Sequence, residues 1–198
     1  LRGKRVALPF PGSPLDFQTR AILRKAGIDP DRDLTLSYSP FAQSVPMLLL
    51  GQIDAAPLPE PLATEAVMNR GLLRLVDYKK AWADASGGNE YSPQVSLFST
   101  AGYARKREPL VRRLVDEWRK ATERVIRDPD SAAAVCAEAL ALPVPVVSVA
   151  VEKTLFLVPS FAENRRMVLE YYEAVKNELP GRRGDLGGEF FFLPDGGR

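Results

Sequence analysis

Apolar and polar residues in the first half of the chain follow two different periods, one typical of strands and one typical of helices. Short runs of β-branched or alternating apolar residues between turn residues predict strands at residues 5–9, 34–39, 53–58 and 72–77. Helical spacing, begun by proline or ended by glycine, predicts helices at residues 15–26, 42–50 and 61–69. Because strands and helices take turns, we expect an α/β fold with a parallel sheet and right-handed crossovers.

The second half of the chain is predicted to be mostly helical. One more strand is expected at residues 94–99, followed by helices at residues 109–127, 130–140, 144–154 and 162–179. The first of these helices is amphipathic, with Leu110, Leu114 and Trp118 on one face. The chain ends near an apolar run at residues 190–192, which we expect to need a covering surface.

Composition places the chain among ordinary globular proteins. Its 198 residues are 45% hydrophobic and 26% charged, enough for one large domain or two small lobes. The 27 basic and 25 acidic residues leave a net charge of +2, which gives no electrostatic footprint for nucleic acid. The densest basic stretch, at residues 105–113, is interleaved with acidic residues and predicts the solvated face of a helix.

The residue inventory argues against catalysis. The chain has no histidine, which removes Ser-His-Asp and Cys-His catalysis and zinc sites of the HExxH type. Its one cysteine, Cys136, lies in an alanine-rich run and is expected to be a small buried hydrophobe, with a reactive thiol as the alternative. The carboxylates of Asp16, Asp54 and Glu60 have no catalytic or metal-ligating companion at a recognisable spacing, and Asp54 is expected to close a local turn. We therefore predict no catalytic residue, no metal site and no cofactor.

Candidate binding residues lie where the predicted strands end, because ligands of open parallel sheets bind beyond the carboxyl ends of the strands. The first such loop carries Phe10, Gly12 and Ser13 before a helix. Free N–H groups at the helix start would donate hydrogen bonds to an anion or a carbonyl group there, while Phe10 offers an apolar or stacking face. The alternative is a plain turn in which Ser13 caps the helix.

Two further loops follow the second and third predicted strands. Ser39 begins the second, where helix capping is the alternative to a ligand contact. In the third, prolines on both sides of Glu60, at Pro59 and Pro61, fix the backbone and aim the carboxylate. That carboxylate would either complement the helix dipole or favour a ligand with an N–H donor or a positive charge. A zwitterion or a heterocycle with donors and acceptors would suit both the first and the third loop.

Four segments, in this order and spacing, resemble a known family. They are LRGKRVA at residues 1–7, PGSP at residues 11–14, GQIDAA at residues 51–56 and PEP at residues 59–61. Further matches are the predicted strand at residues 95–99, the helix start at residues 108–109, the break at residues 128–129 and LPD at residues 193–195. Together they are similar to the substrate-binding proteins of nitrate, sulfonate, taurine and thiamine-pyrimidine importers, the NMT1/THI5-like family. The resemblance implies a type II periplasmic-binding-protein fold, with ligand contacts at Phe10, Gly12, Ser13, Ser39, Pro59 and Glu60.

The resemblance also implies how the chain is organised. Residues 1–105 would form the α/β second lobe with its cleft loops, and residues 106–198 would complete that lobe and contribute to the first. Members of the family begin in lobe one, so the opening segment of that lobe is expected to be missing from this chain. The first residue is Leu1 rather than methionine, which favours a piece of a longer protein.

The function implied is non-catalytic binding of a small solute between two lobes, for delivery to an ABC permease and its ATPase. The resemblance implies a monomer that is peripheral to the membrane, either periplasmic or lipid-anchored and extracellular. Any signal segment would lie outside the chain. The alternative is the ligand-sensing domain of a LysR-like transcription regulator, which shares the fold.

Overall fold

The computed structural model describes residues 1–88, 90–93, 95 and 97–176, which form two compact units. Unit 1 contains Leu1–Ser92 and residues 170–176 at the end of the last helix, and unit 2 contains Pro93–Leu169. The lobe boundary expected from the sequence, between residues 105 and 106, stays a prediction. The predicted strand at residues 94–99 lies partly outside the described residues, and its described members, Val95 and residues 97–99, are not in a strand.

The centre of unit 1 is a pair of parallel strands, β1 (Arg5–Leu8) and β2 (Thr35–Tyr38). Their register runs from Arg5 opposite Thr35 to Leu8 opposite Tyr38. Three consecutive β1 residues are buried, and Val6 and Leu8 pack with Leu23 and Leu34 in the core beneath the strands. The predicted α/β class with a parallel sheet is therefore confirmed.

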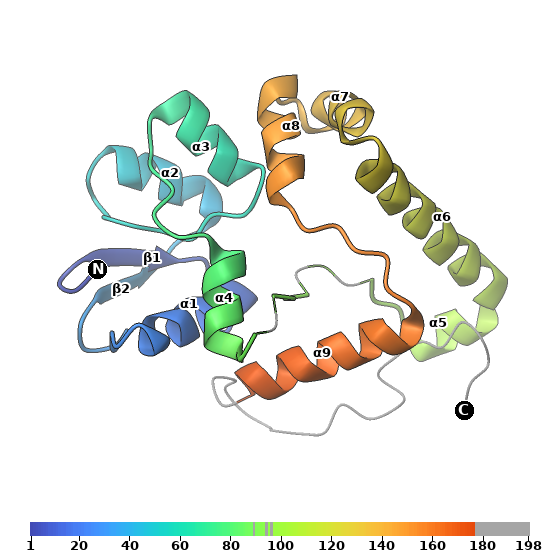
Figure 1. Ribbon diagram of the computed structural model, residues 1–198, viewed down its shortest axis with the longest axis horizontal. Coiled ribbons are helices and arrows are strands. Elements are labelled where there is room, and N and C mark those ends of the chain that lie inside the picture. Colours follow the sequence, from blue (N-terminus) through green and yellow to red (C-terminus); the bar gives the residue numbers. More distant parts are fainter. Residues whose placement is uncertain (89, 94, 96, 177–198) are drawn as a thin grey trace. The chain divides into compact units, whose positions relative to one another are not determined.

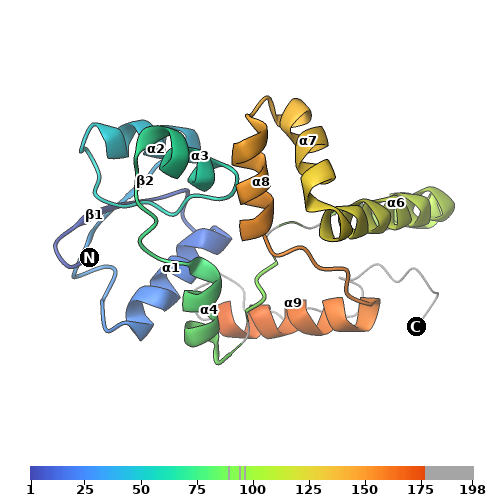
Figure 2. The same ribbon diagram turned by 45° about the horizontal axis from the view of Figure 1, so that its top comes forward.

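Four helices flank these strands, and three of them were predicted. They are α1 (Pro14–Lys25), α2 (Phe41–Leu49), α3 (Leu62–Arg70) and α4 (Tyr78–Ser86). Figures 1 and 2 show α1 and α4 on one side of the strands and α2 and α3 on the other. A second core cluster joins Phe17 of α1, Trp82 of α4 and Val175 near the chain's last described residues.

Two of the predicted strands are wrong. Residues 53–58 form only an isolated parallel bridge, between Ala55 and Val6, since Pro57 and Pro59 have no N–H to donate to a ladder. Residues 72–77 form no strand and leave Leu73 82% exposed, because strand propensity gives no regular structure without a neighbouring strand to pair with. Helix α4 was not predicted, although Asp77 caps its start and Gly87, at φ +83°, ends it.

Among the described residues of unit 2, the regular structure is all helical. Its elements are α5 (Ala101–Lys106), α6 (Glu108–Arg127), α7 (Pro129–Leu140), α8 (Val144–Lys153) and most of α9 (Phe161–Val175). The predicted helices are confirmed here as far as residue 175, and residues 177–179, 190–192 and 193–195 lie outside the described part of the chain. Within that part, no single helix has the length and apolar composition to cross a membrane, and only α7 with α8, bent by 118°, passes when the two are counted together.

Small residues set the packing of α7 on α8. Ala133 is fully buried and, with Ala137, contacts Val147 of α8. Cys136 packs against this cluster and is half-buried, as a small hydrophobe would be. Helix α6, by contrast, buries none of its residues, and Leu110, Leu114 and Trp118 are about half exposed.

Candidate functional site

The three candidate loops leave the sheet of unit 1 at the same edge. Parallel pairing brings Leu8 and Tyr38, the last residues of β1 and β2, side by side, and the Ser39 N–H donates to the Leu8 carbonyl at 2.8 Å. The bridge of Ala55 to Val6 aligns the third segment in the same direction. The three loops that carry the six predicted binding residues therefore all follow segments that run in the same direction, beyond the carboxyl ends of the strands.

In the first loop, an internal carboxylate occupies the helix start that was expected to receive a ligand. Gly12, at φ +77°, donates its N–H to Asp16 Oδ2 at 2.9 Å. Ser13 is buried, and its Oγ accepts from the Asp16 N–H at 3.1 Å, so it is the N-cap of α1. Phe10 is 58% exposed, so its aromatic ring is open to a ligand.

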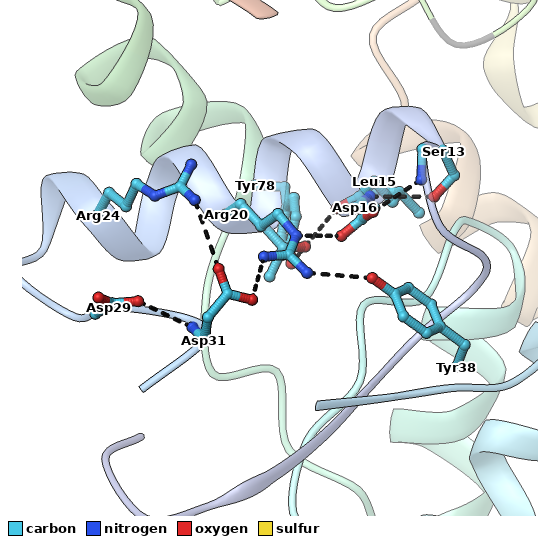
Figure 3. Close-up of polar contacts among 11 residues, drawn as sticks. Ser13, Leu15, Asp16, Arg20, Arg24, Asp29, Asp31, Tyr38 and Tyr78 are labelled. Atoms are coloured by element: carbon cyan, nitrogen blue, oxygen red, sulfur yellow. Dashed lines mark hydrogen bonds and ion pairs between the residues drawn. The ribbon is translucent and has the colours of Figure 1, made fainter. Parts of the chain in front are cut away.

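Asp16 in turn belongs to a network that fastens the first loop to β2 (Figure 3). The Arg20 guanidinium donates to Asp16 Oδ1 at 2.8 Å, to Asp31 Oδ1 at 2.7 Å and to the Tyr38 hydroxyl at 3.1 Å. Burial of the guanidinium lowers the pKa of Arg20, but these hydrogen bonds outweigh the burial and raise that pKa above its usual value. The sequence reasoning missed this network, although the spacing of Asp16 and Arg20, four residues apart on a helix, indicates an ion pair.

The second loop has its hydroxyl groups turned toward the backbone. Ser39 is buried and donates to the Pro40 carbonyl at 3.3 Å, and the buried Ser44 donates to the same carbonyl at 3.4 Å. Pro40 is the N-cap of α2 and has no side-chain acceptor for the first turn of that helix. Both hydroxyl groups are therefore engaged within the loop, while Pro40 and Gln43 are exposed.

In the third loop, Glu60 caps a helix and forms an ion pair, while Pro59 is exposed. One carboxylate oxygen of Glu60 accepts from the Thr64 N–H in the first turn of α3 at 3.0 Å. The other accepts from Arg74 Nη2 at 2.7 Å, and the same nitrogen lies 3.4 Å from Thr64 Oγ1. Arg74 was not predicted as a site residue, because it follows α3 and no local spacing links it to Glu60.

Asp54 fixes the segment that leads into the third loop. The expectation that it closes a local turn is wrong, since its carboxylate binds Arg5 of β1 through one backbone and two side-chain hydrogen bonds. The side-chain hydrogen bonds, together with the backbone N–H of Arg5, hold the pKa of Asp54 well below its usual range. Sequence spacing gave no signal for a contact between residues 49 positions apart.

A comparison with known families identifies the chain. The model of the NMT1-like family matches residues 2–141, which is more than half of the sequence. The chain belongs to the NMT1-like family. No curated protein matches the chain.

The fold of this NMT1-like chain is that of a type II periplasmic binding protein. A similar solved structure is the alkanesulfonate-binding protein SsuA from Xanthomonas axonopodis pv. citri bound to MOPS, with a TM-score of 0.61 and 21% identity. The match covers 91% of this chain but only 60% of that protein, so the chain spans about three fifths of its length.

The carboxylates near these loops are engaged in ion pairs. The carboxylates of Asp16, Asp54 and Glu60 each hold an arginine. Among the described residues, no group of three or more histidine, cysteine, aspartate or glutamate side chains is placed to hold a metal ion. What the NMT1-like loops present is an exposed aromatic ring, proline surface and paired polar groups, as in most sites for small molecules.

Proposed function

We propose that this chain is part of a solute-binding protein that delivers a small molecule to an ABC permease and its ATPase. The observation that carries the proposal is the family match over residues 2–141, combined with three loops at the carboxyl edge of one parallel sheet. Phe10, Gly12, Ser13, Ser39, Pro59 and Glu60 form this chain's share of the solute site. The protein is a monomer, periplasmic or lipid-anchored and extracellular, and catalyses no reaction.

The polar contacts of the loops support a binding role over a catalytic one. A general base needs a carboxylate or imidazole that is free to accept a substrate proton. Asp16 and Glu60 instead accept from an arginine and from a backbone N–H at a helix start. Such groups are rigid and preorganised, which lowers the entropy lost on binding.

Mass spectrometry of the purified protein, first native and then denatured, tests the proposal. We expect a small molecule that stays bound under native conditions and is lost on denaturation. A protein that carries no solute and gains none from a metabolite extract would contradict the proposed function. Retention of the solute-loaded protein by its detergent-solubilised permease separates an importer component from a sensor domain, which would bind the solute without recognising a permease.

A further inference from the structure

We propose that the part of the solute that docks on unit 1 is an uncharged polar group, and that Arg74 sets this preference. The inference rests on the proposed function and names the chemical class that its site accepts. It follows from a single feature of two candidate loops: each carboxylate is already matched by an arginine of the same unit.

The first loop is closed to both signs of charge. An anion at the start of α1 would meet the carboxylate of Asp16, which is 5% exposed and already takes the Gly12 N–H. A cation would find that carboxylate engaged by Arg20. Asp31 is engaged as well, because Arg20 and Arg24 both pair with it, at 2.7 Å and 3.8 Å. The charges of Asp16 and Asp31 are therefore neutralised by those of Arg20 and Arg24.

The third loop is neutral but keeps capacity for hydrogen bonds. The side chains of Glu60 and Arg74 are 15% and 37% exposed, so the pair is partly open to a ligand. Each Glu60 oxygen accepts one hydrogen bond in the structure, and a carboxylate oxygen can accept two. Arg74 donates from Nη2 alone, which leaves Nε and Nη1 without a partner among the described residues.

Acceptors and donors therefore lie beside each other on one ion pair. A carboxamide or a lactam matches this arrangement, since it carries an N–H and a carbonyl next to each other. A charged group would have to give up its hydration for a site of no net charge, and such desolvation is costly. Selectivity against charged groups follows from the unpaired charge that they would bring.

Arg74 determines whether the site prefers an uncharged or a positively charged group. In Arg74→Gln, Glu60 keeps its place as the cap of α3 but loses its counter-charge, so an ammonium group becomes the preferred partner. In Glu60→Gln, the guanidinium is left without a carboxylate, and an anionic group becomes preferred. A residue that only supports the loop would weaken all ligands alike and would not reverse their order.

Four matched probes measure this order by NMR titration: benzamide, benzoate, benzenesulfonate and benzylammonium. We expect wild type to bind benzamide best, Arg74→Gln to favour benzylammonium by about tenfold over wild type, and Glu60→Gln to favour benzoate and benzenesulfonate by a similar factor. Arg70→Gln removes an exposed charge from the end of α3 and should leave the order of the four probes unchanged.

The outcomes separate this inference from the proposed function. A wild type that prefers a charged probe, or an unchanged order in both Arg74→Gln and Glu60→Gln, overturns the inference while solute binding itself stands. Binding of none of the probes, together with no solute in the mass spectrum, overturns both. If the spectrum does show a solute, its own structure decides: a group that docks on unit 1 as a sulfonate, carboxylate or ammonium contradicts the inference, and an amide-like group supports it.

Discussion

The Asp54 carboxylate binds Arg5, 49 residues earlier in the chain, through three hydrogen bonds: it accepts from the backbone N–H at 2.8 Å and from Nε and Nη2 at 3.0 Å each. This contact holds the segment before the third loop against β1, where Ala55 makes the only bridge that residues 53–58 contribute. The Arg5–Asp54 pair thus attaches this segment to β1, where a strand at residues 53–58 was expected to pair with it.

The same pair predicts a dependence of stability on pH. The pKa of Asp54 is lower in the folded protein than its ordinary value of 3.8, so its contribution is fully present above that value and is lost as pH falls through the folded pKa. We expect Asp54→Asn to lower the urea midpoint at pH 7 and the difference from wild type to shrink below about pH 4. Asp84→Asn, at an exposed carboxylate, is the control. A difference that is equal at pH 3 and pH 7 would contradict the assignment.

Two half-buried tyrosines, Tyr78 and Tyr171, are expected to respond in opposite directions to loss of their hydroxyl groups. Burial raises the pKa of both Tyr78 and Tyr171 to about 12. The hydroxyl of Tyr78 lies 2.7 Å from Thr19 Oγ1, whereas that of Tyr171 is buried without a partner in the described structure.

We therefore expect Tyr78→Phe to lower the free energy of unfolding by about 1 kcal/mol and Tyr171→Phe to raise it by about 1 kcal/mol. Chemical denaturation at pH 7 measures both, and the ring contact of Tyr171 with Trp82, at 5.5 Å between centroids, is kept in the phenylalanine variant. Destabilisation by Tyr171→Phe would show that its hydroxyl has a partner.

Ser13 is expected to matter for stability as well as for any ligand. Because its Oγ caps α1, Ser13→Ala should lower the free energy of unfolding by about 1 kcal/mol. Ser131→Ala, at an exposed position of α7, is the matched control and should change little. Thermal or urea denaturation gives the comparison, and equal stabilities of the two variants would contradict the capping role.

The packing of α7 on α8 depends on the small side chain of Ala133. We expect Ala133→Leu to lower the free energy of unfolding by about 1–3 kcal/mol, because a fully buried site has no room for three more carbons. The neighbouring Ala134 is exposed, so Ala134→Leu should lie within about 0.5 kcal/mol of wild type. Circular dichroism during urea denaturation measures both, and a tolerated Ala133→Leu would show that the helices separate readily.

Local signals predicted most of the helices but failed for two of the strands, for a physical reason. Ser13 at its start and Gly27 after its end are the signals that predict helix α1. Asp77 and Gly87 are the same kind of signal for α4, which could have been predicted in the same way. Residues 72–77 have strand composition, but a strand is made by its hydrogen-bonding neighbour, and composition does not reveal whether one is present.

The common edge of the candidate loops was predictable from the sequence, but the charge of those loops was not. Parallel strands end at one edge, so Phe10, Ser39 and Pro59 could be grouped from the chain pattern alone. The Glu60–Arg74 pair joins residues that no helical or strand period connects, and it determines whether the loop is negative or neutral. We expected free N–H groups at the first loop that could bind an anion. In the structure the Gly12 N–H donates to the Asp16 carboxylate instead.

An NMR titration of the labelled protein with its copurified solute tests the central claim, that the loops at one edge of the sheet bind the solute. The account predicts saturable changes in the amide signals of Phe10, Gly12, Ser39 and Glu60, with α6 and α8 unaffected. Changes confined to the helices of unit 2, with the signals of the three loops unmoved, would contradict it.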